Sequence, residues 1–474
     1  MKILFAASEA LPYFKTGGLG DVLGSLPKCL AANGHDVAVV IPYYRSLKDN
    51  ASEDIRYVAS TMVDLAWRKQ YCGIYAAVNE GVRYYFIDNE YYFARPTPYG
   101  QYDDGERFAF FSKALLEMLQ FVDFKPDVIH ANDWQTALVP LFYDAFFRSL
   151  EGYEDIKTVF TIHNIEYQGF CQLNFLSDVC GVPDKYYPIY EFAGCINLMK
   201  GALVMSDAIT TVSPTYASEL SYSFYGHGLE TIIRAEAHKL TGILNGIDLK
   251  EYNPRTDPLI PFTYSPDSRG GKAKCKAALQ KELGLKVSPN TMLIGVVSRL
   301  VSHKGLDLIR AIFSELMQAD VEVVVLGVGD HQYEDFFSAA ETHYPGRVKA
   351  CLAFDSALSH RIYAAADLFL MPSKAEPCGL SQMIAMRYGT IPLVRETGGL
   401  KDTVSPVDDE GNGRGFTFRT YNAHDMLSAL WRATAAFADK EKWSRIVTAA
   451  MSYNSGWDVS AERYAALYHH LCNK

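Results

Sequence analysis

Residues 1–20 read MKILFAASEALPYFKTGGLG, and this stretch decides the fold class. The apolar run at residues 3–7 predicts a buried strand, and the turn Lys15-Thr16-Gly17-Gly18-Leu19-Gly20 predicts the start of a helix. The helical pattern ends near Asn33-Gly34, where glycine suits a helix C-cap, and a second apolar run follows at residues 37–41. A strand, a helix and a second buried strand are typical of a parallel sheet covered by helices.

The same alternation continues along the chain and restarts once. Further strands of a first half are expected at residues 82–87, 128–130, 158–162, 208–212 and 243–244. A helical connector near residues 271–283 precedes a second set of strands, expected at residues 292–298, 321–326, 348–352, 368–371 and 391–394. We therefore predict an α/β protein of two Rossmann-like domains, residues 1–245 and 246–457, with a C-terminal helix at 458–474 that packs back on the first domain.

The composition is that of a globular protein and excludes several classes. The 474 residues carry 45 Lys and Arg against 55 Asp and Glu, which argues against a nucleic-acid partner because such proteins usually present a basic face. No run approaches the ~18 apolar residues of a membrane span, and the N-terminal apolar run is too short for a secretory signal. Nine cysteines form no Cys-x-x-Cys pair, which favours neither a disulfide framework nor a zinc site. We expect a cytoplasmic protein that binds no membrane.

Basic and glycine-rich turns follow several predicted strands. Backbone N–H groups at Gly17-Gly18 could approach an anion at the start of a helix, and Lys15 adds a full charge. Arg299 and Lys304 follow the first strand of the second domain and could grip a diphosphate, with Thr397-Gly398-Gly399 holding it from another side. An ordinary strand–helix turn and a solvated basic turn are the open alternatives.

Three further residues lie at strand ends where sugars could bind. Glu376 is followed by a predicted helix start near Gly379, so a carboxylate and free N–H groups would meet there, as sugar hydroxyls require. Asp133 could orient or deprotonate an acceptor hydroxyl, and His163 could present its ring or its carbonyl. The alternatives are a helix N-terminal acid for Glu376, a helix N-cap for Asp133 and a packing residue for His163.

Two nucleotide-dependent classes are disfavoured by spacing. The segment Gly18-Leu19-Gly20-Asp21-Val22-Leu23-Gly24 misses the dinucleotide fingerprint because position 23 is Leu, and no acid follows the second strand. A Gly-x-x-x-x-Gly-Lys-Ser/Thr phosphate loop does not occur in the sequence.

The combination of these motifs resembles glycosyltransferase family 5, the glycogen and starch synthases. The matching segments span nearly the whole chain in order: Ser8-Glu9, Lys15-Thr16-Gly17-Gly18-Leu19, His130-x-x-Asp133-Trp134, Thr161-Ile162-His163-Asn164, Asn245-Gly246-Ile247-Asp248, Arg299-Leu300, Lys304-Gly305-Leu306-Asp307, Ser359-His360-Arg361-Ile362, Glu376-Pro377-Cys378-Gly379-Leu380 and Thr397-Gly398-Gly399-Leu400. The resemblance implies a GT-B fold, in which the two parallel sheets face a deep cleft between an acceptor-side and a nucleotide-sugar-side domain. It also implies retaining transfer of glucose from ADP-glucose to the non-reducing 4-hydroxyl of an α-1,4-glucan, with no cofactor and no metal.

The resemblance further implies roles for single residues. Arg299 and Lys304 would bind the leaving diphosphate, and Glu376 would hold the glucosyl hydroxyls. The His163 carbonyl would face the anomeric carbon, and Asp133 would place donor or acceptor hydroxyls. The donor-binding residues would be Lys15, Gly17, Gly18, Asn245, Phe354, Cys378, Gly379, Leu380, Thr397, Gly398 and Gly399, and the acceptor-side residues would be Glu9 and Tyr99.

Several features bear on the exact reaction. Ile384 stands eight residues after Glu376, where many retaining GT-B enzymes have a second carboxylate, which weakens a covalent mechanism. Phe354 stands where the family often has a tyrosine, and the Val301-Ser302-His303 loop also departs from the family pattern. Another retaining GT-B transferase that uses UDP-glucose or a different acceptor, and a non-catalytic glucan-binding homologue, are the alternatives. The 31 tyrosines include a loop with Tyr91, Tyr92, Tyr99 and Tyr102, some of which could stack on glucan.

Overall fold

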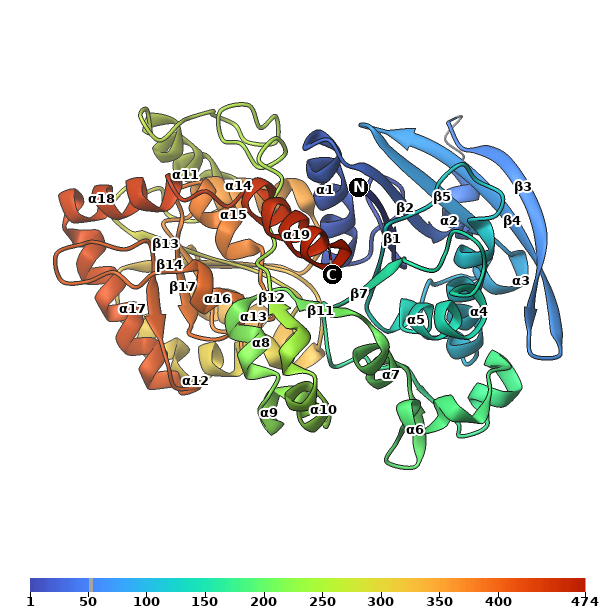
Figure 1. Ribbon diagram of the computed structural model, residues 1–474. Helices are drawn as coiled ribbons and strands as arrows, with labels where there is room; N and C mark the ends of the chain where they lie inside the picture. The colour runs from blue at the N-terminus through green and yellow to red at the C-terminus, as the bar shows by residue number, and fades with distance from the viewer. Residues whose placement is uncertain (51–53, 474) are drawn as a thin grey trace. The chain divides into compact units, whose positions relative to one another are not determined.

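The computed structural model describes residues 1–50 and 54–473, which form two compact units (Figure 1). Unit 1 consists of Met1–Asn245 and the C-terminal segment from Trp457, and unit 2 consists of Gly246–Gly456. Each unit contains a largely or wholly parallel sheet with helices connecting its strands, which confirms the predicted α/β class.

Unit 1 is built on a nine-stranded sheet in the order β12-β11-β7-β6-β1-β2-β5-β4-β3. The strands from β12 to β5 are parallel, whereas β4 and β3 are antiparallel to their neighbours. The strands are β1 (Lys2–Ala6), β2 (Asp36–Pro42), β3 (Arg56–Leu65), β4 (Arg68–Asn79), β5 (Val82–Asp88), β6 (Val128–Asn132), β7 (Lys157–Ile162), β11 (Ala208–Thr211) and β12 (Leu240–Gly242). A second, three-stranded sheet contains β8 (Phe170–Cys171), β10 (Cys195–Asn197) and β9 (Glu191–Phe192).

Two parts of this sheet differ from the prediction. The strand expected at residues 243–244 is wrong, because Leu240–Gly242 pairs with β11 in the order Ile209 to Leu240 and Thr211 to Gly242. The edge strand β3 and its neighbour β4 were not anticipated. Most residues of β3 are exposed, so its sequence lacks the continuous apolar run that marked the buried parallel strands.

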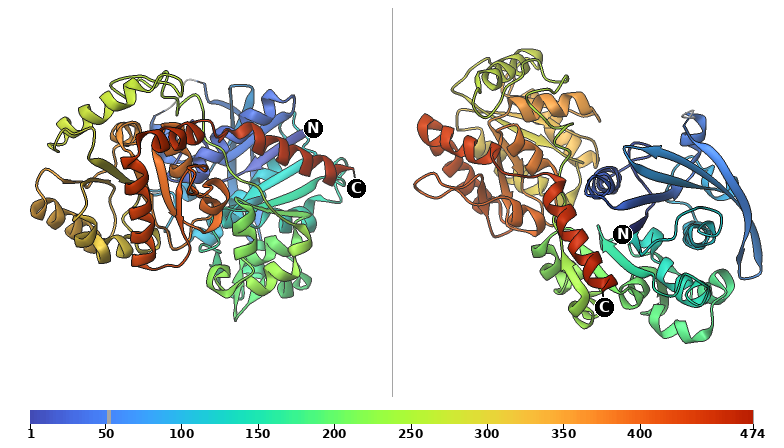
Figure 2. Two further views of the ribbon diagram at one scale, coloured as in Figure 1. Left: turned by 90° about the vertical axis from the view of Figure 1, so that its left-hand side faces the viewer. Right: turned by 45° about the horizontal axis from the view of Figure 1, so that its top comes forward.

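Helix α1 (Gly18–Ala32) and helix α19 (Trp457–Cys472) lie side by side in unit 1 (Figure 2). The buried residues of α1 include Leu23, Leu26 and Leu30, whose spacing gives one apolar face. Tyr464 and Tyr468 of α19 share the same hydrophobic cluster. The other helices of unit 1 are α2 (Arg45–Asp49), α3 (Glu90–Phe93), α4 (Asp104–Met118), α5 (Val139–Phe142), α6 (Tyr187–Tyr190), α7 (Leu198–Met205), α8 (Pro214–Glu219), α9 (Ser223–Gly226) and α10 (Glu230–Ala235).

Unit 2 is built on a six-stranded, wholly parallel sheet in the order β15-β14-β13-β16-β17-β18. Its strands are β13 (Met292–Val297), β14 (Val321–Leu326), β15 (Val348–Cys351), β16 (Leu368–Met371), β17 (Ile391–Arg395) and β18 (Phe416–Phe418). Its helices are α11 (Gly270–Glu282), α12 (Leu306–Leu316), α13 (His331–His343), α14 (Ser356–Ala365), α15 (Ser381–Arg387), α16 (Gly398–Thr403), α17 (Ala423–Ala438) and α18 (Lys440–Met451).

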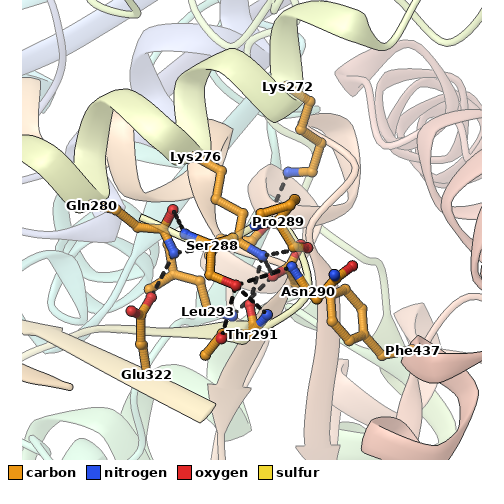
Figure 3. A network of polar contacts seen from close by, with 12 residues as sticks. Lys272, Lys276, Gln280, Ser288, Pro289, Asn290, Thr291, Leu293, Glu322 and Phe437 are labelled. Carbon is orange, nitrogen blue, oxygen red and sulfur yellow. Dashed lines mark hydrogen bonds and ion pairs between the residues drawn. The ribbon is translucent and has the colours of Figure 1, made fainter. Parts of the chain in front are cut away.

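A polar network fixes the amino ends of the unit 2 strands to α11 (Figure 3). Lys276 Nζ lies 2.6 Å from Asp367 Oδ2 and donates to the carbonyl of Thr291 at 2.7 Å. One helical turn further, Gln280 donates to Glu322 Oε2 at 2.7 Å. Thr291 and Asp367 directly precede β13 and β16, so the amino ends of these strands are occupied by hydrogen bonds and an ion pair that hold α11 against the sheet. The carboxyl ends of the same strands carry the predicted site residues.

Candidate functional site

The residues singled out from the sequence form two groups, one in each unit. The unit 1 group follows β1, β5, β6 and β7, and the unit 2 group follows β13, β16 and β17. Ligands of open parallel sheets bind at the carboxyl ends of strands, so both groups are in the expected position. The unit 1 group contains Glu9, Lys15, Gly17, Gly18, Tyr99, Asp133 and His163, and the unit 2 group contains Arg299, Lys304, Glu376, Cys378, Gly379, Leu380, Thr397, Gly398 and Gly399.

The glycine turn before α1 already faces an anion from its own chain. Gly17 occupies the N-cap position of α1, and the buried Glu9 carboxylate accepts hydrogen bonds from the N–H groups of Thr16 (2.5 Å) and Gly17 (3.0 Å). The Thr16 hydroxyl donates to the other Glu9 oxygen at 2.6 Å. The expected affinity of this turn for negative charge is therefore visible, but Glu9 supplies the charge.

Tyr99 is brought to the same carboxylate from a loop 90 residues away. Its hydroxyl donates to Glu9 Oε1 at 2.6 Å and lies 2.8 Å from Ser8 Oγ. Burial, together with the nearby Tyr44 and Glu9, raises the pKa of Tyr99 well above its usual value. Glu9 and Tyr99 thus act together inside unit 1, and their contact with an acceptor stays a prediction.

Lys15 is paired with a residue that the sequence analysis did not single out. Its Nζ lies 2.5 Å from Asp21 Oδ1, in the first turn of α1. Burial raises the pKa of the Asp21 carboxyl. An acid six residues after the lysine, at the start of a helix, was the signal in the sequence that could have found this pair.

Asp133 bridges two neighbouring strand ends. Its Oδ1 accepts from the backbone N–H of His163 (2.8 Å) and of Asn164 (3.3 Å), and its backbone adopts φ +56°, which is rare outside glycine. The side chain makes no capping hydrogen bond to the following 3₁₀ turn, so the N-cap alternative is wrong. Burial raises the pKa of Asp133 to about 7, which suits a group that exchanges protons near neutral pH.

The His163 ring is a neutral, hydrogen-bonded side chain. Burial lowers its pKa to about 3. Its Nε2 lies 2.9 Å from Asn132 Oδ1, and the Asn132 amide nitrogen donates to the carbonyls of Ala6 and His130. Asn132 Oδ1 is therefore the acceptor, and His163 Nε2 carries the proton. The packing alternative is correct for the ring, and Asn132, one residue before Asp133, is a positioning residue that the sequence analysis missed.

In unit 2, Lys304 and Glu376 form an ion pair across 72 residues of sequence. Lys304 Nζ lies 2.7 Å from Glu376 Oε2, and Ser373 Oγ donates to the same oxygen at 2.9 Å. The Glu376 side chain is largely buried, and its Oε1 accepts no hydrogen bond from the part of the chain that the structure describes. Because α15 begins five residues later, at Ser381, the alternative of a first-turn helix acid is wrong.

Arg299 differs from Lys304 although both follow β13. Its side chain is exposed, and among residues 1–50 and 54–473 no hydrogen bond or ion pair of its guanidinium is found. A planar cation with five free donors fits a diphosphate better than a single ammonium does. Lys304 is held in place by Glu376, whereas Arg299 keeps its hydrogen-bonding capacity for a ligand.

Gly398 and Gly399 have a structural task beside the one that was predicted. Gly398 adopts φ +44°, and a Cβ there would overlap the carbonyl of Glu376. A Cβ on Gly399 would overlap Cys378, and the Gly399 N–H donates to the carbonyl of Pro377 at 3.1 Å. The turn at the fully buried Thr397 therefore packs against the segment that carries Glu376. Because the Gly399 N–H already donates to the carbonyl of Pro377, it is not free to donate to a diphosphate.

Arg395 is a second positioning residue that the motifs did not reveal. It ends β17, is buried, and donates from Nε to the carbonyl of Ser373 at 3.0 Å and from a terminal nitrogen to the carbonyl of Lys374. These contacts fix the turn that carries Ser373 and Glu376. An arginine at the end of an otherwise apolar strand was the available signal.

The remaining predicted residues differ in their surroundings. Phe354 lies two residues before α14, and its side chain is 93% exposed. A face of its ring is therefore open to stacking. Asn245 ends the first segment of unit 1, and its buried Oδ1 has no hydrogen-bond partner in the described chain. Cys378 is buried, and Gly379 adopts φ +69°, where a side chain would be strained. Leu380 is half-buried at the start of α15.

The tyrosine loop divides into packing and exposed rings. Tyr92 is fully buried and donates to Glu106 at 2.6 Å, so it cannot stack on a glucan. Tyr91 and Tyr102 are exposed and keep that capacity. In the described residues no group of three or more His, Cys, Asp or Glu side chains has a metal-binding arrangement, and no helix there is long and apolar enough to cross a membrane.

Comparison with protein families gives two matches that together cover most of the chain. The starch synthase catalytic domain matches residues 2–235, and the glycosyl transferases group 1 family matches residues 279–446. Glycogen synthases are similar over the full length: that of Geobacillus thermodenitrificans is 48% identical, covering 100% of this chain and 98% of its own. That of Clostridioides difficile is 46% identical, covering 100% of both.

Solved structures agree with this result. The catalytic domain of Starch Synthase IV from Arabidopsis thaliana, bound to ADP and acarbose, is 37% identical with a TM-score of 0.92, covering 100% of this chain and 99% of its own. Sucrose-phosphate synthase from Thermosynechococcus elongatus, at 17% identity and a TM-score of 0.61 over 99% of this chain and 98% of its own, shares the fold. With the strand-end groups in both units, these similarities show that the chain belongs to the glycogen and starch synthase family of GT-B glycosyltransferases.

Proposed function

We propose that this enzyme transfers glucose from ADP-glucose to the non-reducing 4-hydroxyl of an α-1,4-glucan, with retention of configuration and without a metal ion. The observation that carries the proposal is the arrangement of Arg299, Lys304 and Glu376 at the carboxyl ends of β13 and β16. The Arabidopsis starch synthase structure, which contains ADP and acarbose, supports an adenine nucleotide and an α-glucan as ligands.

The two cations act on the leaving group. When the bond between the anomeric carbon and the diphosphate breaks, negative charge develops on ADP, and fixed cations lower the energy of that state. Lys304 is preorganised by Glu376, and Arg299 offers unused donors. Protein cations therefore supply the charge stabilisation that a divalent metal supplies in other transferases.

Glu376 is assigned to the sugar rather than to covalent catalysis. Its Oε2 is occupied by Lys304 and Ser373, which leaves Oε1 to accept from a glucosyl hydroxyl. A nucleophilic carboxylate with a partner acid about 5 Å away is the pattern of retaining hydrolases. The position eight residues after Glu376 is Ile384, which is buried and apolar. Retention is therefore proposed to occur without a glycosyl-enzyme intermediate.

Asp133 and His163 are assigned to the unit 1 side of the same reaction. The raised pKa of Asp133 lets its carboxyl accept from or donate to a hydroxyl near neutral pH. The same residue fixes the backbone of His163 through its N–H, which sets the direction of the next carbonyl. We also assign the reaction to the cytoplasm, since none of the nine cysteines forms a disulfide.

The test is radiolabel transfer from ADP-glucose or UDP-glucose, at equal concentration, into glycogen with EDTA present. The proposal expects faster transfer from ADP-glucose, full activity in EDTA, and a labelled product that β-amylase releases as maltose. Faster transfer from UDP-glucose would instead favour the alternative of a UDP-glucose-dependent transferase. The exposed Phe354 ring could stack on the base of that donor, although it lacks the hydroxyl of a tyrosine. No transfer from either donor, with glucan binding retained, would favour a non-catalytic homologue.

A further inference from the structure

A cavity of about 310 Å³ lies in unit 2, outside the residues assigned to the substrates. This volume is at the lower end of small-molecule sites, about 300–1,000 Å³. Its six lining residues come from the loop between β12 and α11 and from the ends of α15 and α18. The lining residues are Asn253, Pro254, Arg255, Pro266, Arg387 and Met451.

Two arginines face this cavity without a strong partner. Arg387 is half-buried at the end of α15, and its Nε donates to the Tyr252 carbonyl at 3.4 Å. No partner of its two terminal nitrogens is found in the described part of the chain. Arg255 lies 3.5 Å from Asp267, but both side chains are more than half exposed, and such pairs contribute little.

The charge in the cavity is unbalanced. Burial and the Arg255 cation lower the pKa of Arg387, and no carboxylate contributes to that shift. Two guanidinium groups that face one space repel each other, and an anion between them would remove the repulsion. Guanidinium groups bind phosphate oxygens through paired hydrogen bonds, which makes a phosphate group the best-matched anion.

We propose that this cavity binds a phosphate group, either as inorganic phosphate or as a phosphorylated sugar, through Arg255 and Arg387. Pro254, Pro266 and Met451 form apolar walls against which the C–H groups of a sugar ring would pack. The site is separate from the donor-binding turn at residues 378–380. Helix α15 begins next to that turn and ends at Arg387, so its seven residues place the two about 10 Å apart along the helix.

The experiment is calorimetric titration of inorganic phosphate into the full-length enzyme with ADP saturating, so that ADP fills the diphosphate site first. We expect one phosphate to bind the wild type. Arg255→Ala should weaken binding by about tenfold or more, because a charge-assisted hydrogen bond is lost. Arg445→Ala removes another exposed arginine of unit 2, one that contacts only a backbone carbonyl, and should leave the affinity unchanged.

The measured phosphate affinities decide whether this cavity is a phosphate-binding site. Equal phosphate affinity of wild type and Arg255→Ala, or no phosphate binding at millimolar concentration, would overturn the proposal. Arg387→Gln provides a second variant, and if its melting curve shows a folding defect, the exposed Arg255 decides alone. A hexose monophosphate that binds more tightly than phosphate identifies the sugar ester as the ligand, and equal or weaker binding identifies the free ion.

Discussion

The two predicted groups of site residues differ in how completely their charged side chains are paired within the chain. In unit 1 the charged groups around the glycine turn are satisfied internally, because Glu9 takes the N–H groups of the turn and Asp21 takes Lys15. In unit 2 the pair of Lys304 and Glu376 is built, but Arg299 and one Glu376 oxygen have no partner in the described residues. The comparison indicates that unit 2 is preorganised for a charged ligand, whereas unit 1 must exchange internal contacts to bind one.

The largest effect is expected from removing a cation of unit 2. Arg299→Ala or Lys304→Ala should lower kcat by about 100-fold or more, as expected for the loss of an electrostatic donor. The melting temperature should separate the two variants, because Lys304→Ala leaves the largely buried Glu376 without its cation and Arg299→Ala breaks no contact. Transfer rates near wild type in either variant would contradict the diphosphate role.

A smaller effect, on the order of tenfold to a hundredfold in kcat, is expected for Asp133→Asn, because a charged hydrogen bond is lost. If the ionised form is required, the wild-type rate falls as the pH drops below about 7, and the variant loses that limb of the profile.

Stability provides an independent readout of Asp133. Its pKa is raised in the folded state, so the folded protein binds this proton more tightly than the unfolded chain does. Stability from this group is present at low pH and is lost as the pH rises from about 4 toward 7. Asp133→Asn should therefore raise the melting temperature more at pH 8 than at pH 5, and the reverse order would contradict the burial of this charge.

Ser373→Ala tests the preorganisation of unit 2 at a finer level. The variant removes one of the two contacts to Glu376 Oε2 and keeps Lys304, so kcat should fall by about threefold to tenfold. The KM for ADP-glucose should change less than kcat if the serine only fixes the carboxylate. A variant with an unchanged kcat would show that Lys304 and Arg395 suffice to position this turn.

Tyr99→Phe in unit 1 is expected to change turnover least of these variants, and its main effect should be on stability. It removes one hydrogen bond to the Glu9 carboxylate, which should cost about 1.5–3 kcal/mol of stability by urea denaturation. Tyr102→Phe is the matched control, since that ring is 90% exposed and should change stability little. Equal stability of the two variants would contradict the internal satisfaction of Glu9.

Several elements could be predicted because their sequence signals are local. The buried parallel strands, such as Val321–Leu326 and Leu368–Met371, are continuous apolar runs, and the start and end of α1 are marked by glycines. Strands β3 and β4 were missed because a half-exposed edge ribbon has no such run. The strand near residue 240 was misplaced because pairing with β11, rather than local hydrophobicity, sets its register.

By itself, the sequence determined the α/β class, the family resemblance and which residue types stand at the strand ends. The tertiary structure alone decided which of those groups are already occupied. Glu376 meets Lys304 across 72 residues because parallel strands bring distant loops to one edge of a sheet, whereas Glu9 meets Thr16 and Gly17 within the one loop that joins β1 to α1. Arg255 and Arg387 share a cavity because the loop after residue 250 lies against the end of α15, and the surroundings of a charge depend on neighbours in space and not on neighbours in the chain.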